Sequence, residues 1–122
     1  MEAVIIRTST GTAPFYNTGL VQVQSGNLTF PNVVTNSGTF NAVAGSTIYF
    51  LATTTNRFNS GTVFSGQGVN RITGGVSSFD GAIQSANLEL NGTVVNLEGT
   101  YTLAGSLNWI AATLRGNGTV TV

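Results

Sequence analysis

The residues with the clearest chemical potential are two carboxylates that each precede a glycine. Asp80 stands before Gly81 and Glu98 stands before Gly99, so the two acids are 18 positions apart. If the chain stacks in coils of about that length, the carboxylates lie roughly 5 Å apart, close to the separation used by retaining glycosidases. The competing interpretation is a polar turn that faces water, and it is favoured because the equivalent positions are also polar: Thr18, Ser37, Ser60 and Asn117. We therefore expect the protein not to be an enzyme.

Other catalytic and metal chemistry is largely excluded by composition. The 122 residues include no Cys and no His, which rules out disulfides, thiolate or imidazole metal sites and Ser-His-Asp catalysis. The four basic residues balance four acids, so there is no positive stripe for phosphates, and we expect no nucleic-acid partner. No apolar run approaches about 18 residues, so we expect no membrane insertion. We also expect no cofactor and no metal.

The elements that must position these residues recur along the chain. A glycine followed by a short alternation of apolar and polar residues appears at near-equal spacings of 19, 23, 20, 18 and 19: Gly19, Gly38, Gly61, Gly81, Gly99 and Gly118. Each interval holds a second run rich in β-branched and aromatic residues, and several hold a third. No apolar stripe with helical spacing and caps occurs, so we expect essentially no helix.

Three short strands per unit of about 20 residues predict an all-β fold, a single-stranded β-solenoid (a right-handed parallel β-helix) of about five to six coils. The alternative is a β-sandwich or jelly roll, which does not require one phrase to recur at this spacing. The first expected inward column is Val21, Phe40, Val63, Ile83, Tyr101 and Val120. The second is Leu28, Ile48, Leu88 and Leu107, and the expected outward column is Leu20, Thr39, Thr62, Ala82, Thr100 and Thr119.

Some residues that could bind a ligand do not fit the expected columns. Phe64 and Phe79 fall outside the inward columns, which indicates either an exposed contact patch or a register slip. The 23-residue interval is expected to bulge as a loop, and such loops often bind ligands. The candidate loop residues are Thr53, Thr54, Thr55, Asn56, Arg57 and Phe58. Tyr101 and Trp109 suit a sugar-binding surface, although large aromatics in so small a repeat more often fill the core.

The two ends of the chain differ from the repeats and from each other. Residues 1–18 are expected to form an N-terminal cap or an irregular first coil, and residues 19–122 the solenoid repeats. The segment 119–122 reads as the opening strand of a further coil, and its unpaired edge would template more pairing. The candidate assembly edge is Thr119, Val120, Thr121 and Val122. The expected partner is another copy of the chain, joined end to end or edge to edge.

Residues 90–109 and 114–122 carry a resemblance to a known class. The phrase Gly-Ser-Leu-Asn-Trp at 105–109, followed by Leu-Arg-Gly-Asn-Gly-Thr-Val-Thr-Val at 114–122, resembles the Gly/Thr/Asn-rich repeats of large bacterial surface proteins such as filamentous-haemagglutinin-like adhesin stalks. The resemblance implies an extracellular or cell-surface, non-enzymatic scaffold, although residues 1–7 lack the pattern of a signal peptide. The alternatives are a module that binds a carbohydrate, a host surface or ice, and a segment of a viral fibre.

Overall fold

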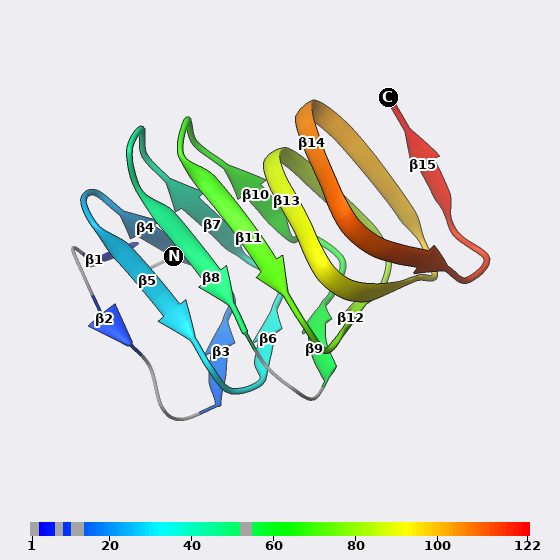
Figure 1. Cartoon of the computed structure of the whole chain (residues 1–122), viewed down its shortest axis with the longest axis horizontal. Coiled ribbons are helices and arrows are strands. Elements are labelled where there is room, and N and C mark those ends of the chain that lie inside the picture. The colour runs from blue at the N-terminus through cyan, green and yellow to red at the C-terminus, as the bar shows by residue number, and fades with distance from the viewer. Residues whose placement is uncertain (1–2, 7–8, 11–13, 52–54) are drawn as a thin grey trace.

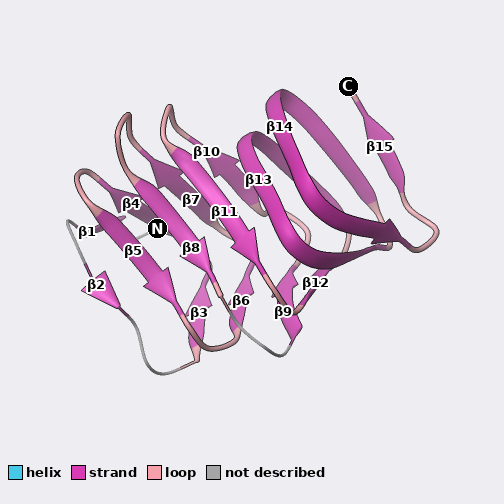
Figure 2. Cartoon of the chain, in the orientation of Figure 1, coloured by secondary structure: helices cyan, strands magenta, loops and turns pink. Residues whose placement is uncertain are grey.

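The computed structural model describes residues 3–6, 9–10, 14–51 and 55–122, in which all regular structure is β-strand (Figures 1 and 2). The part of the chain that it describes therefore contains no helix that could span a bilayer. The strands are β1 (Ala3–Ile6), β2 (Ser9–Thr10), β3 (Phe15–Asn17), β4 (Leu20–Val23), β5 (Asn27–Phe30), β6 (Val34–Asn36), β7 (Thr39–Ala42), β8 (Thr47–Phe50), β9 (Thr55–Phe58), β10 (Val63–Ser65), β11 (Val69–Thr73), β12 (Val76–Phe79), β13 (Ala82–Leu97), β14 (Thr100–Arg115) and β15 (Thr119–Thr121).

The strands stack as a β-solenoid of about five turns with three faces. On the first face, β1, β4, β7 and β10 pair in order and lead into the starts of β13 and β14 and then β15. The second face holds β2, β5, β8, β11 and the middles of β13 and β14, and the third holds β3, β6, β9, β12 and the ends of β13 and β14. Every described ladder is parallel, which confirms the solenoid and excludes the sandwich, whose ladders are antiparallel.

Glycine at the corners allows neighbouring coils to approach closely. Gly99 stacks directly on Gly81, and a Cβ atom added to Gly99 would collide with the backbone oxygen of Gly81. Gly81 also has a φ of 84°, a left-handed conformation that residues with a Cβ rarely adopt. At this corner the close approach of the coils requires a glycine at 99, and the left-handed backbone favours a glycine at 81.

The first inward column matches the sequence expectation only in two separate parts, Val21 with Phe40 and Ile83 with Tyr101 and Val120. The two parts do not join, because Phe64 pairs with Ser85 rather than with Ile83. Val21 and Phe40 pair in register and are fully buried, but the next member is Phe64, because Val63 pairs with Thr39 on the outer side. The second column contains all four expected residues, with the buried Asn70 between Ile48 and Leu88: Leu28, Ile48, Asn70, Leu88 and Leu107. The sequence alignment on Gly61 was thus wrong by one residue in β10.

The same slip corrects the outward column. Thr62 was expected to face outward, but it is fully buried, and its hydroxyl donates to the backbone oxygen of Asn59 at 2.8 Å. Phe64 and Phe79 are buried as well, so the register slip is the correct explanation and they form no exposed contact patch. The physical cause is the length of the corner, because the chain takes three steps from Asn36 to Thr39 but five steps between their paired residues Phe58 and Val63.

The extra residues of the long interval do not form one loop. The ends of these segments pair between successive coils, so their lengths can be compared corner by corner. The segment 42–48 has one residue more than 23–28, 50–57 has two more than 30–35, and 58–63 has two more than 36–39. Each corner of this coil therefore has one or two more residues between paired positions than that of the coil before it.

Phenylalanine rings fill the interior from β3 to β12. Neighbouring rings meet mostly edge to face, as between Phe40 and Phe50, whose centroids are 5.0 Å apart with an interplanar angle of 78°. Phe58 contacts both Phe64 and Phe79 in the same way. Edge-to-face pairs are the favoured geometry for aromatic side chains, so this column contributes more than area burial alone. The series ends at Tyr101, whose ring lies 5.6 Å from that of Phe79.

Buried asparagines form hydrogen bonds at the corner between the third face and the first. Asn36 is 1% exposed, and its Nδ2 donates to the backbone oxygen of Gly38 at 2.9 Å and to Oγ1 of Thr62 at 3.0 Å. Its Oδ1 accepts from the Gly38 amide at 3.1 Å and from Nδ2 of Asn17 at 2.8 Å. These four bonds satisfy a polar side chain where an apolar one would leave corner backbone groups without partners.

Candidate functional site

The most elaborate polar cluster on the outside lies along the second face. Tyr49, Arg71, Glu89 and Asn108 occupy one register column on β8, β11, β13 and β14. The Arg71 guanidinium carbon sits 5.2 Å from the centroid of the Tyr49 ring, and its Nε forms an ion pair with Oε2 of Glu89. Asn108 completes the row, because its Nδ2 donates to Oε1 of Glu89 at 2.9 Å. Glu89 is only 7% exposed, so its charge is held by these two partners rather than by water.

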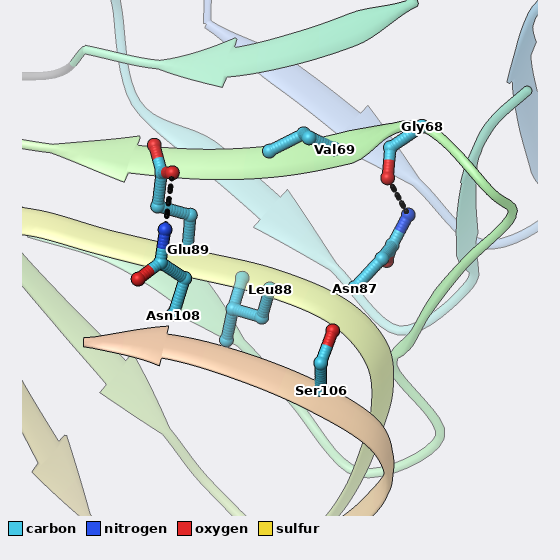
Figure 3. A pocket seen from close by; sticks show the side chains of 7 residues that line it. All are labelled: Gly68, Val69, Asn87, Leu88, Glu89, Ser106 and Asn108. Atoms are coloured by element: carbon cyan, nitrogen blue, oxygen red, sulfur yellow. Dashed lines mark hydrogen bonds between the residues drawn. The ribbon is translucent and has the colours of Figure 1, made fainter. Parts of the chain in front are cut away.

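A hollow of about 200 Å³ opens beside this row, at the corner between the first and second faces. Figure 3 shows side chains from three successive coils around it. Its lining is Gly68, Val69, Asn87, Leu88, Glu89, Ser106 and Asn108. The lining combines a carboxylate, two amides and a hydroxyl with the partly exposed Val69, while Leu88 is almost fully buried.

The hollow exists because the corner of β13 has fewer residues than the corners on either side of it. From Phe64 to Asn70 the chain takes six steps, whereas the paired residues Ser85 and Leu88 are only three steps apart. The neighbouring corner in β14 is longer again, so the corner of β13 is recessed between two that project (Figure 1). The recess is held rigidly, because Nδ2 of Asn87 donates to the backbone oxygens of Ser65 at 2.9 Å and of Gly68 at 3.1 Å.

The paired carboxylates do stand on adjacent coils. Phe79 pairs with Leu97 and Ala82 pairs with Thr100, which places Asp80 and Glu98 at equivalent corner positions. Oδ2 of Asp80 accepts a hydrogen bond from the Ser78 hydroxyl at 2.9 Å. Neither acid lines the hollow, and no cluster of three metal-ligating side chains occurs within the described residues. At this corner Glu98 is exposed and Asp80 is partly buried.

The candidate loop at 53–58 is corrected in its geometry. Thr53 and Thr54 lie outside the described residues, and Thr55–Phe58 form strand β9 on the third face. Asn56 and Phe58 are buried, and Oδ1 of Asn56 accepts from the Val34 amide at 2.9 Å. Within this strand only Arg57 is exposed, because the alternation that buries its neighbours turns it outward. A ligand could therefore touch β9 only through its outer side chains.

The two aromatic candidates have different environments. Tyr101 is 3% exposed and belongs to the core, where its hydroxyl is hydrogen bonded to Ser85 Oγ. Burial raises the pKa of Tyr101, an effect that the Ser85 hydrogen bond partly offsets. Trp109 is 44% exposed although it pairs with the buried Leu90, because it belongs to β14 at the open end of the stack.

That open end contains the candidate assembly edge. Thr119–Thr121 form β15, which pairs in parallel with Thr100–Thr102 of β14, and every residue from 119 to 122 is exposed. Among the described residues, the rest of β14 pairs only with β13, on one side. The backbone N–H and C=O groups of β14 are therefore accessible at this edge, and so are its inward side chains.

Sequence reasoning missed the ion pair of Arg71 and Glu89. The hydrogen bond from Nε of Arg115 to Oδ1 of Asn96, at 2.7 Å, was missed as well. The sequence did contain a signal for the pairing of Arg71 with Glu89. Each stands directly before an apolar residue, Ile72 or Leu90, and these two apolar residues pair in neighbouring coils. The hollow had no such signal, since it depends on how many residues each corner contains.

Comparison with known proteins adds no identification. No protein-family model, no curated protein and no solved structure matches this chain. The function must therefore be argued from the geometry of the solenoid itself.

Proposed function

We propose that this chain is a non-enzymatic structural module that assembles end to end with further copies of itself in an extracellular fibre, filament or adhesin stalk. The observation that carries the proposal is the open edge of β14 and β15. Trp109 is 44% exposed, whereas Leu90, its partner in the coil before, is 2% exposed. Ile110 and Val120 are also exposed, at 55% and 42%.

The chemistry of this edge favours a β-strand partner. A strand edge presents a row of N–H and C=O groups that pair readily with another strand. A polar ligand would meet these groups but would leave Trp109 and Val120 in water. A strand that continues the ladders satisfies the backbone and covers the apolar side chains together, as in β-strand addition.

A second copy of the chain offers such strands. Among the described residues at the opposite end of the stack, β1, β2 and β3 each pair on one side, with β4, β5 and β6. Contact between unlike ends of two copies is heterologous, and such contacts generate open filaments when they do not close into a ring. The formal net charge of zero places no strong electrostatic barrier between copies.

The placement outside the cell rests on the resemblance of residues 90–122 to adhesin stalk repeats. It fits a protein whose chemistry is sparse and whose residues mainly build regular coils. A stalk needs length and stiffness, and stacked coils supply both without a catalytic centre.

Negative-stain electron microscopy and sedimentation over a concentration series test the assembly. We expect filaments of uniform width that lengthen with concentration, built from coils about 4.8 Å apart. The double variant Trp109→Lys/Val120→Lys places charges on the inward side of the edge and should leave single particles. The matched control Thr113→Lys/Thr121→Lys puts the same charges on outward positions of the same strands and should still assemble.

Two results would overturn the proposal. The first is discrete small particles of the natural sequence at every concentration. The second is loss of assembly in both double variants alike, which would mean that added charge, rather than the inward edge, controls association. Circular dichroism of each variant distinguishes a failure to assemble from a failure to fold.

A further inference from the structure

We propose that the hollow between Gly68 and Asn108 is a binding site for one residue of a neutral sugar. This activity is distinct from end-to-end assembly, although Ser106 and Asn108 of the lining belong to β14. It also differs from the loop and aromatic sites that the sequence suggested. Three properties of the hollow lead to this class of ligand: its charge, its hydrogen-bonding groups and its size.

The charge of the hollow disfavours ions. Glu89 is the one ionisable residue in the lining, and the ion pair with Arg71 balances its charge. An anion would meet this carboxylate with no basic residue in the lining to bind it. A metal cation would find one carboxylate already paired, and no cluster of three metal-ligating side chains lies within the described ranges. A neutral ligand avoids both costs.

The polar groups suit a ligand that carries several hydroxyls. An ionised carboxylate has about four lone-pair sites, and the bonds to Arg71 and Asn108 use two of those on Glu89. The side chain of Ser106 can both donate and accept, and Oδ1 of Asn108 can accept. Adjacent hydroxyls of a sugar can donate to the carboxylate while another accepts from Ser106.

The aliphatic part of the lining serves the other side of such a ligand. Val69 on β11 is partly exposed, whereas Leu88 on the neighbouring β13 is only 1% exposed, so Val69 is the accessible aliphatic side chain of the lining (Figure 3). A sugar ring presents C–H groups as well as hydroxyls, so it can contact carbon and polar atoms together. Binding sites commonly combine an apolar lining with a few convergent polar groups in this way.

The size limits the ligand to a single ring. A volume of about 200 Å³ equals the share of roughly seven liquid waters at about 30 Å³ each, and it is below the range of about 300–1,000 Å³ usual for drug-sized ligands. The site would thus hold one terminal or branching residue of a glycan, with the remainder in solvent. Because the hydrogen bonds of Asn87 fix the recess, little ordering is needed on binding.

Saturation-transfer NMR on the purified chain tests the site directly. The probes are methyl glucoside, methyl galactoside, methyl mannoside and N-acetylglucosamine at millimolar concentration, with inorganic phosphate and calcium chloride titrated separately by protein-observed NMR. We expect at least one sugar to receive saturation and neither ion to shift the hollow's amides. Asn108→Ala should weaken binding about tenfold, the loss of roughly one good hydrogen bond.

A matched pair of variants locates the binding. Ser106→Phe should fill the hollow and abolish transfer, whereas Ser25→Phe, at the same corner of an earlier coil, should leave it intact; both residues are exposed, so both substitutions should be tolerated. The proposal is overturned if no sugar receives saturation, if transfer persists in a folded Ser106→Phe, or if phosphate or calcium binds the hollow instead. Filament formation by the natural sequence is measured separately, so a failure of sugar binding and a failure of assembly are distinguished.

Discussion

The coils of β4–β12 and the coil of β14 follow the same pattern of inward and outward residues but differ in what they enclose. In the former, Phe40, Phe64 and Phe79 are at most 1% exposed, and rings from successive coils contact one another. In the latter, Leu103, Leu107 and Leu114 are only partly buried, and Trp109 is 44% exposed. Inward orientation alone does not bury a side chain in a solenoid. Burial also requires a coil on each side.

This difference is a general property of stacked repeats. Each coil contacts only its neighbours, so the stability of the stack is approximately a sum of coil terms and interface terms. A coil covered on one side lacks one interface and is expected to open more readily than the interior. The coil of β14 should therefore be the part of the described molecule that responds most to a partner.

The largest expected contrast comes from removing one aromatic ring in each region. Phe64→Ala leaves a cavity among four neighbouring rings, and it should lower the free energy of unfolding by about 3–5 kcal/mol. Trp109→Ala removes a half-exposed ring with one hydrogen bond to the backbone oxygen of Ala112, and it should cost about 1 kcal/mol. Urea denaturation of the unassembled protein measures both.

Equal losses for the two variants would contradict the comparison. They would mean that the coil of β14 is packed as tightly as the interior. Conversely, Trp109→Ala could lower the free energy of unfolding much more in filaments than in the unassembled protein. That result would support the comparison, because the partner then covers the edge.

Polar contacts should show the same contrast on a smaller scale. Asn36→Ala removes four buried hydrogen bonds and leaves groups of Asn17, Gly38 and Thr62 without that partner, so it should cost about 2–4 kcal/mol. Asn96→Ala removes the exposed bond to Arg115 on the same face and should cost less than about 0.5 kcal/mol. Thermal and urea denaturation check the pair, and a small loss for Asn36→Ala would show that water replaces its bonds.

The periodicity of the sequence was sufficient to predict the architecture. Glycines at near-equal spacing and period-two alternation specify parallel stacked coils, and the second inward column was correct at every residue predicted. Alternation specifies only which side of a strand a residue lies on. It therefore gave the columns wherever the strands of successive coils were matched at the right residue.

The errors arose where corner lengths changed. Val63 and Thr62 were misplaced because Gly61 was aligned with Gly38, although the chain adds residues at that corner. The hollow was missed for the same reason, since it depends on a short corner in β13 beside a long one at 65–69. Corner length affects packing without altering the alternation, so a pattern based on strands does not detect it.

The buried asparagines had a signal that was not used. Asn17 and Asn36 each stand two residues before a glycine, and each bonds to that glycine across the turn, Asn17 to Gly19 and Asn36 to Gly38. An asparagine that recurs at a corner is expected to satisfy local backbone groups rather than to face water. A single sequence nevertheless does not say how deeply such a corner is buried.

Tyr101 lies at the boundary between the two regions and allows the smallest and most specific test. Its ring packs on Phe79 of the interior while its strand belongs to the open coil, and burial raises the pKa of its hydroxyl above the ordinary value of 10.0. The unfolded chain then loses this proton first as pH rises. The stabilising contribution is fully present below about pH 10 and is lost as pH increases through the folded pKa. The melting temperature should therefore fall above pH 10.

Tyr101→Phe isolates this effect. The variant has no proton to lose at this position, so its melting temperature should decline less steeply above pH 10, although near neutral pH it should be less stable by about 1–2 kcal/mol because Ser85 Oγ loses its buried partner. Parallel decline in both proteins would show that the ring is solvated in solution, and hence that the coil of β14 is open as far as Tyr101. A flatter curve for the variant would place the limit of the closed core beyond Tyr101, between this residue and the exposed Trp109.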